Sequence, residues 1–499
     1  MKQDHIIQKV FVEITVNNKE KAFGIKEEIS SFLSMDIFPE IEKYINALEY
    51  KMVGETLQIP RLELNLDIKN STLNAELKDK IAQLFKEELS EATKNIEVLN
   101  HEKGNETKAY LVNNEKKLIQ TFIHFLEKGY MPWWNSTTSG IDLLEPKVFD
   151  TIISADNFEK NIIPVLSKQT VRERIINQLS DEQIAQFCLI ILKNKELKIN
   201  LENDVIRFIL KLNDTDRMIL WRLILNIVTE FLTSSITDIK KYLLQKITKA
   251  ESFSIGLSQA KSKSENSKMI AKIFPFIKEH EIFETLESLQ SSKTVKNNLT
   301  NDSENPDSAS EKAIQKKQKV SENLSQSNED LIIKNEGQYV QNAGLILIHP
   351  FIKTFFEHCD LWDKKTQQLA DPELCAHLLH YIATGNTNAP EYDMIFEKFL
   401  CNIPMNQTIN RHIKLSRKHK IQAKKVIESV QHNWNPMKKS SAALLQNEFF
   451  QRSGKLVVTD RDFTLTIERK AQDILLDKLA WGIGLVKLPW QEKFIYINW

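Results

Sequence analysis

The residues of this chain best suited to metal chemistry are histidines and cysteines in its last third: His358, Cys359, Cys375, His377 and His380. His377 and His380 are three positions apart, so both would lie on one side of a helix, and Cys359 lies about one helix earlier. Zinc binds such side chains, but structural zinc sites usually contain cysteine pairs separated by two to four residues, which this sequence lacks. We therefore favour buried cysteines and hydrogen-bonded or surface histidines, and we expect no metal.

The sequence also lacks the familiar motifs of catalysis. It contains no P-loop, no G-x-S-x-G, no H-E-x-x-H and no dinucleotide fingerprint. Gly482-Ile-Gly484 has no third glycine and is more typical of a turn that leads into a strand. Glutamate pairs such as Glu27-Glu28 and Glu87-Glu88 lie on predicted solvated helix faces, where nothing would tune them for proton transfer. We expect no catalytic residue and no cofactor, and therefore a protein that is not an enzyme.

The overall composition indicates a folded, soluble protein. Lys+Arg and Asp+Glu number 67 each, so no basic excess favours nucleic acid, and the basic run 312–319 is flanked by acidic residues. Four cysteines in 499 residues do not form a disulfide framework. The opening residues lack the apolar core of a secretory signal, and the apolar stretch 218–232 carries a polar stripe typical of an amphipathic helix. We expect a cytoplasmic protein that binds neither nucleic acid nor membrane.

Glycine (12) and proline (13) are scarce, which favours helix, and apolar periodicity places the elements. Near the amino end, alternation predicts two paired strands, 7–16 and 61–67, between which a helix over 19–49 is kinked or divided at Pro39. A further helix is predicted at 74–92. The middle is predicted to be helical at 114–129, 158–179, 180–192, 202–212, 215–233, 236–249 and 266–289. A capping-box pattern at Ser180 and Gln183 marks the start of one of these helices.

The carboxyl-terminal part shows helical periodicity followed by strand patterns. Helices are predicted at 344–360, 371–384, 391–401, 413–432, 440–451 and 470–478, with a hairpin of strands 455–459 and 463–468 and further strands 483–488 and 493–498. Residues 291–337 contain no aromatic residue and are rich in polar ones, so we expect a disordered linker there. The predicted domains are a small α/β domain 1–100, a helical middle 101–290, the linker 291–337 and a helical domain 338–499 that ends in a small sheet. The fold class is mainly α, multi-domain, with small α/β portions at both ends.

Tryptophans gather at two places where they suggest contacts with other proteins. Trp133 and Trp134 follow a predicted helix, and Leu488, Pro489, Trp490 and Trp499 lie at the carboxyl end. Such residues fill a core or a domain seam more often than they form a docking patch, and the sequence leaves both interpretations open. We name these six residues as candidate protein-docking residues.

A resemblance to one family runs through both ends of the chain and part of its middle. Gly129-Tyr-Met-Pro-Trp-Trp134 is similar to a Gly-x-x-Pro-Trp-Trp turn of that family, and Asn342-Ala-Gly-Leu345 is similar to another of its signatures. The segments that carry the resemblance are His5–Ile14, Ile59–Leu66, Gly129–Trp134, Val171–Leu179, Asn342–Phe351, Leu378–Gly385, Leu400–Pro404, Trp481–Gly484 and Leu488–Trp490. Together they resemble the tape measure proteins of contractile injection systems, the phage-tail-like particles of bacteria.

This resemblance implies a structural and assembly role, namely setting the length of the inner tube and the contractile sheath, without catalysis or cofactor. It implies inner tube, baseplate or cap proteins as partners, with possible self-association and retention in the particle. A ruler is naturally one long helix, and 499 residues as one helix would span about 750 Å, whereas this sequence breaks into short elements. Extension inside the tube, several copies sharing the task, and an assembly chaperone or an end-cap or baseplate adaptor therefore remain open alternatives.

Overall fold

The computed structural model describes residues 6–16, 18–49, 55–66, 73, 75–94, 110–135, 142–234, 238–249, 260–282, 284 and 337–499. The predicted linker 291–337 lies outside these residues except for Gly337. The chain divides into two compact units. One comprises Met1–Phe122, Pro132–Leu143 and Asp150–Phe158, and the other comprises Ile123–Met131, Leu144–Phe149 and Glu159–Trp499. The domain boundaries given above stay predictions.

Helices dominate the first unit. They are α1 (Lys19–Phe32), the π-helical turn η1 (Leu33–Ile37), α2 (Phe38–Glu49) and α3 (Ala75–Lys94). Their apolar faces share a core cluster of Phe32, Ile37, Ile41, Phe85 and Leu89. The predicted division of the first helix is confirmed, because the wider turn η1 comes just before Pro39, whose missing N–H interrupts the regular helical ladder.

The prediction of two paired amino-terminal strands, 7–16 and 61–67, is wrong. Residues 6–16 and 59–66 have no strand structure; instead β1 (Glu55–Gln58) pairs antiparallel with β2 (Tyr110–Asn113). The alternation in 61–66 does set burial, because Leu62 and Leu64 pack against the core cluster while Arg61 and Glu63 are exposed. Alternation shows which side chains face inward, but a strand also needs a hydrogen-bonded neighbour, which periodicity alone does not supply.

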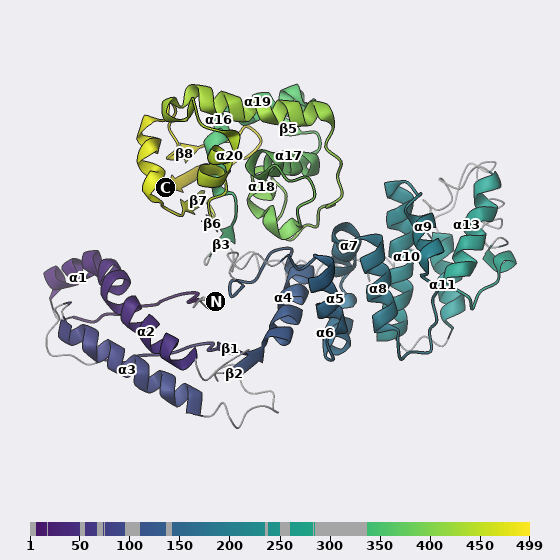
Figure 1. Ribbon diagram of the computed structural model, residues 1–499, viewed down its shortest axis with the longest axis horizontal. Coiled ribbons are helices and arrows are strands. Elements are labelled where there is room, and N and C mark those ends of the chain that lie inside the picture. Colours follow the sequence, from purple (N-terminus) through teal and green to yellow (C-terminus); the bar gives the residue numbers. More distant parts are fainter. Residues whose placement is uncertain are drawn as a thin grey trace, which may run out of the picture. The chain divides into compact units, whose positions relative to one another are not determined.

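The stretch from Asn114 to Ile273 is largely helical, as expected (Figure 1). Its helices are α4 (Asn114–Lys128), α5 (Pro146–Ser154), α6 (Phe158–Leu166), α7 (Gln169–Gln178), α8 (Asp181–Ile191), α9 (Asn203–Ile209), α10 (Asp214–Thr233), α11 (Ile239–Lys249) and α13 (Ala260–Ile273). The capping box of α8 is confirmed: Gln183 N donates to Ser180 Oγ at 3.2 Å, and Ser180 N donates to Gln183 Oε1 at 3.0 Å.

Three details of this stretch differ from the prediction. Helix α5 was not predicted. The single helix predicted at 158–179 is two, α6 and α7, because the chain turns at Ser167, where Arg172 Nη1 donates to the carbonyls of Leu166 and Ser167 at 2.5 and 2.8 Å. The helix predicted at 266–289 is interrupted after Ile273, where α13 ends two residues before Pro275, which disfavours helix in the residue that precedes it; the chain is helical again at 279–282 and 284. None of the described helices combines the length and apolar content that crossing a bilayer requires.

The carboxyl-terminal part packs short helices against a five-stranded sheet. The strands run in the order β3 (Gln338–Val340), β6 (Gly454–Val458), β7 (Phe463–Ile467), β9 (Ile495–Asn498) and β8 (Leu485–Val486), and only β7 and β9 are parallel. A second, two-stranded hairpin pairs β4 (Trp362–Asp363) with β5 (Gln368–Leu369). The predicted hairpin at 455–468 is therefore confirmed, and its partners across the sheet come from both ends of this part of the chain.

The helices of this part are η4 (Ala343–Ile348), α16 (His349–His358), α17 (Pro372–Thr384), η5 (Glu391–Asp393), α18 (Ile395–Leu400), α19 (Arg417–Asn433), η6 (Asn435–Met437), α20 (Ala442–Leu445), η7 (Gln446–Phe450) and η8 (Ala471–Lys478). The helix predicted at 470–478 is present as the 3₁₀-helix η8. The mainly α fold class with small sheets is confirmed.

Gly344 marks the tightest approach within this core. A Cβ at this position would lie 1.6 Å from the carbonyl oxygen of Phe449, so η4 and η7 touch backbone to backbone there. Only glycine permits this contact. By contrast, a Cβ at Gly482 would meet nothing within 4 Å.

Gly344→Ala should therefore lower the free energy of unfolding by about 3 kcal/mol or more, because two backbone segments must separate to admit one methyl group. Urea unfolding followed by tryptophan fluorescence measures this. Gly482→Ala is the matched control and should stay within about 0.5 kcal/mol of wild type. Equal midpoints for the two variants would show that η4 and η7 are not in contact.

Candidate functional site: a buried ionic junction

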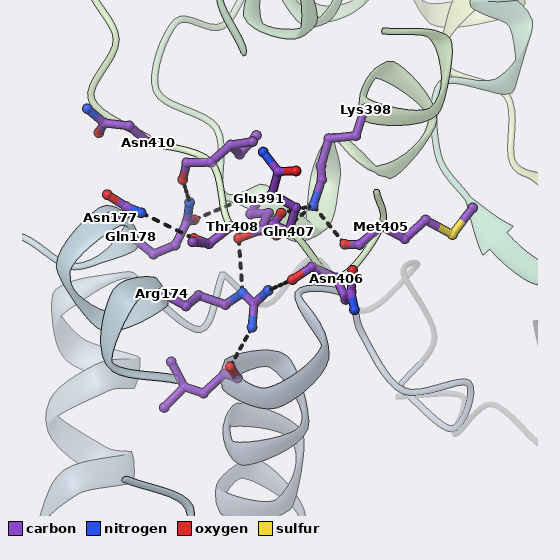
Figure 2. A network of polar contacts seen from close by, with 12 residues as sticks. Arg174, Asn177, Gln178, Glu391, Lys398, Met405, Asn406, Gln407, Thr408 and Asn410 are labelled. Atoms are coloured by element: carbon purple, nitrogen blue, oxygen red, sulfur yellow. Dashed lines mark hydrogen bonds and ion pairs between the residues drawn. The ribbon is translucent and has the colours of Figure 1, made fainter. Parts of the chain in front are cut away.

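Arg174 on α7 is fully buried, and its guanidinium group joins segments that are far apart in the sequence (Figure 2). Nε donates to Glu391 Oε2 at 3.1 Å, Nη1 donates to the carbonyl of Leu126 at 2.6 Å, and Nη2 donates to the carbonyl of Asn406 at 2.5 Å. The flat, forked guanidinium group suits such divergent acceptors, which a lysine could not reach together. Arg174 therefore ties α4, α7, η5 and the loop after α18 to one another.

Lys398 on α18 is the second buried cation of this site. Its Nζ donates to Glu391 Oε1 at 2.7 Å and to the carbonyls of Met405 and Gln407 at 2.7 and 2.5 Å, which occupies all three of its protons. The side chains of Arg174, Glu391 and Lys398 have no exposed surface. We call this group, together with Gln178, the Arg174 junction.

Gln178, one turn after Arg174, completes the junction through neutral contacts. Its Nε2 donates to the carbonyl of Ile409 at 2.7 Å, and its Oε1 accepts from the backbone N–H of Glu391 at 2.8 Å. Both ends of this amide are therefore used, as burial requires. Residues 174 and 178 project from one face of α7, so the second half of this helix lines the junction.

The junction holds two cations against one carboxylate, which has an electrostatic consequence. Burial lowers the pKa of Lys398, and the Glu391 carboxylate partly opposes this shift. Burial also raises the pKa of Glu373, which accepts from the backbone N–H of Asn410 at 3.4 Å. The peptide carbonyls around Arg174 and Lys398 supply the remaining negative potential. Since most of them belong to the loop after α18, that loop is part of the charge balance.

Gly129, the residue that follows α4, lies directly against the ion pair of the junction. It ends α4 with a φ of +86° and donates its N–H to the carbonyl of Phe125 at 2.8 Å. A Cβ here would lie 2.5 Å from Glu391 Oε1 and 2.9 Å from Arg174 Nη2. Glycine is therefore required both for the left-handed backbone and for the space that the ion pair occupies.

Three of the motifs singled out in the sequence thus meet at one place. The turn that begins at Gly129, the helix that contains Arg174, and the Leu400–Pro404 turn that follows Lys398 all border the junction; Ile403 N donates to the Lys398 carbonyl at 2.9 Å. A family model described as the contractile injection system tape measure protein matches residues 4–499. The chain belongs to this family. A search of curated proteins and a search of solved structures found no match.

Sequence reasoning located the motifs of this tape measure family protein but missed Glu391 and Lys398. A signal was present, because Glu397 and Lys398 stand inside the apolar run Ile395–Leu400, where charges are rare unless they are paired. What the sequence did not show is that the partner of Lys398 is Glu391, seven residues earlier, or that Arg174 reaches the same carboxylate from 217 positions away.

Beside the junction, the histidines considered as metal ligands make other contacts. His377 Nε2 donates to the carbonyl of Asn410 at 2.8 Å, and His380 Nδ1 donates to Glu397 Oε1 at 2.9 Å. Cys359 and Cys375 are buried, and burial raises the pKa of both thiols. Among the residues that the structure describes, no group of His, Cys, Asp or Glu side chains has the geometry to hold a metal ion.

The candidate docking residues lie in different environments. Trp133 is 38% exposed and meets Trp134 edge to face, with ring centroids 5.8 Å apart. Leu488 and Trp490 are buried, and Trp490 Nε1 donates to the carbonyl of Leu400 at 2.7 Å. The side chains of Leu488 and Trp490 thus pack in the core of this structure, which is the alternative that the sequence left open.

The two remaining docking candidates lie nearer the surface. Pro489 is exposed, and Trp499 is partly buried against the carboxyl-terminal core. Docking by any of the six residues stays a prediction.

Glu391→Gln should lower the free energy of unfolding by about 3–5 kcal/mol, because it leaves two buried cations without a counter-charge. Adding Lys398→Met should recover part of this loss, since it removes one of those cations. Chemical denaturation of the full chain measures both effects.

Glu173→Gln is the matched control for this substitution. Glu173 binds Arg222 through two 2.7 Å contacts, but Arg222 is 43% exposed, so the change should cost at most about 1 kcal/mol. Similar costs at positions 173 and 391 would contradict the importance of the buried junction.

The pH dependence of stability should report on His377. Burial lowers its pKa from 6.5 to about 4, so neutral His377 favours the folded state. Its contribution is complete above pH 6.5 and is lost as the pH falls toward 4, by about 3 kcal/mol in total. His377→Gln keeps a donor for Asn410 but does not titrate. The wild type should therefore lose stability more steeply than this variant between pH 7 and pH 4, and parallel curves from urea unfolding would refute the assignment.

Proposed function

We propose that this chain is a non-enzymatic assembly protein that sets the length of the inner tube and sheath of a contractile injection particle. The observation that carries the proposal is the match of the tape measure family model to residues 4–499. The proposed partners are tube, baseplate or cap proteins, and the proposed site of assembly is the cytoplasm.

The described structure supports a particular division of labour for this role. The longest described helices, α3 and α10, contain 20 residues each, and one such helix spans about 30 Å. Arg174 and Lys398 also tie α4 and α7 to the carboxyl-terminal part through buried charges, which resist being pulled apart. We infer that residues 338–499, with the helices bound at the Arg174 junction, act as a folded anchor at one end of the particle.

Under this proposal, the measuring length lies outside the anchor. The sequence offers two candidates for it, the segment 291–337 and the part of the helical middle that follows α7. An assembly chaperone, or an end-cap or baseplate adaptor, remains the second candidate function, because the packed short helices described here suit a compact protein better than a straight ruler.

Duplicating residues 295–334 in frame tests the measuring role. Forty additional residues should lengthen the tube by about 60 Å if they are helical and by up to about 130 Å if they are extended. The same number of residues inserted into the loop between α8 and α9 tests the helical middle. Particle length in electron micrographs measures both effects.

The control insertion belongs in the exposed turn at Lys364–Thr366, inside the anchor, and should leave particle length unchanged. Particles of normal length from every insertion, or no particles at all, would favour a cap, chaperone or adaptor, and the presence of the chain in purified particles separates a cap from a chaperone that leaves. The same assay tests docking by Trp133 and Trp134, since normal assembly of Trp133→Ala/Trp134→Ala would exclude it.

A further inference from the structure

Helix α19 concentrates positive charge on its outer side. Residues 398–427 contain no Asp or Glu, although the chain as a whole has 67 acidic and 67 basic residues. Arg417, Lys418, Lys424 and Lys425 on α19 are all exposed. The positive charge is therefore local, and it lies on α19.

The spacing of these residues places them on one face. The pairs 417–418 and 424–425 are about two helical turns apart, and together they span about 12 Å along the axis. Ile421, which is 48% exposed, lies between the two basic pairs. The opposite face packs into the core through Ala423, Val426, Ile427 and Val430, where α19 contacts α16 and α17 (Figure 1). We call Arg417, Lys418, Ile421, Lys424 and Lys425 the basic face.

The chain itself offers little negative charge to the basic face. Asp360 pairs with Lys418, and Glu428 lies 3.6 Å from Lys424, whose side chain is 76% exposed. Within the described residues, neither Arg417 nor Lys425 forms an ion pair. The surface is therefore left with net positive charge around one exposed apolar side chain.

The positive charges in the first turn of α19 lower the stability of this helix. The first turn of α19 contains no acidic residue and carries Arg417, Lys418 and Lys420, although the positive end of the helix dipole favours acidic residues there. Ser416 caps the helix by accepting from the backbone N–H of His419 at 3.1 Å, which satisfies one amide but leaves the repulsion. Because these cations do not stabilise the fold, we look for their role in binding.

We propose that the basic face of α19 is a docking surface for an acidic protein surface, with Ile421 as its apolar anchor. Charge complementarity selects an anionic partner, and three of its four cations are lysines, which suit separate carboxylates rather than the paired geometry of a phosphate-binding arginine fork. The apolar centre with a charged rim matches the anatomy of a protein interface.

Binding of a synthetic helical peptide with a repeating Glu/Leu pattern to the full chain tests the proposal. In low salt the wild type should bind the peptide, and Lys424→Glu/Lys425→Glu should weaken binding roughly tenfold or more through charge reversal. The matched control is Lys438→Glu/Lys439→Glu, which makes the same charge change at exposed lysines just beyond α19 and should stay within about twofold of wild type. Ile421→Ser should weaken binding without changing its dependence on salt.

Several outcomes would overturn the proposal. They are no binding of the acidic peptide in low salt, equal losses in both lysine double variants, or stronger binding to a DNA duplex or to phosphatidylglycerol vesicles than to the peptide, with the same dependence on Lys424 and Lys425. The surface does not rely on length control, so a failure here leaves the insertion experiments on tube length unaffected, and the reverse also holds.

Discussion

The burial of three charges at the Arg174 junction constrains much of the second unit. Removing Arg174, Glu391 and Lys398 from water costs several kcal/mol for each ion unless every donor finds an acceptor at close range. The fold meets this demand with one carboxylate and several peptide carbonyls. Because those carbonyls belong to the end of α4 and to the loop after α18, neither segment can move without exposing or orphaning a charge. A buried pair adds little net stability, but it penalises every alternative arrangement of the segments that it joins.

This constraint bears on how a tape measure family protein can work. A ruler must extend or span a distance, whereas the junction holds Arg174 within hydrogen-bonding distance of Leu126 and Glu391, and Lys398 within hydrogen-bonding distance of Glu391. Pulling the carboxyl-terminal part away from α7 would strand cations in an apolar interior. Under the function proposed above, a body fixed in this way would serve as the anchor, and the measuring length would lie in other segments of the chain.

The sequence was informative where structure is local and less so where it depends on distant partners. Periodicity predicted α3, α8, α10, α17 and α19, and the Ser180 capping box is present as expected, because these features need only neighbours within one or two turns. The strand predicted at 7–16 failed because a ladder needs a partner strand, and β1 pairs with Tyr110–Asn113 instead. Likewise, the motifs at Gly129 and Arg174 were visible, but the carboxylate on which both depend lies more than two hundred positions away.

The buried cation Lys398 and the exposed cations of α19 relate to the fold in opposite ways. Lys398 is buried, so its charge is matched proton by proton, and its surroundings fix the architecture. Arg417 and Lys425 are exposed, so water screens their charges and they need no ion-pair partner within the fold. Helix α19 can carry Arg417 and Lys418 in its first turn, where the helix dipole disfavours cations, because Val426, Ile427 and Val430 hold its other face in the core. The residues on its inner side are therefore constrained by packing in the core, whereas packing does not constrain the charged residues on its outer side.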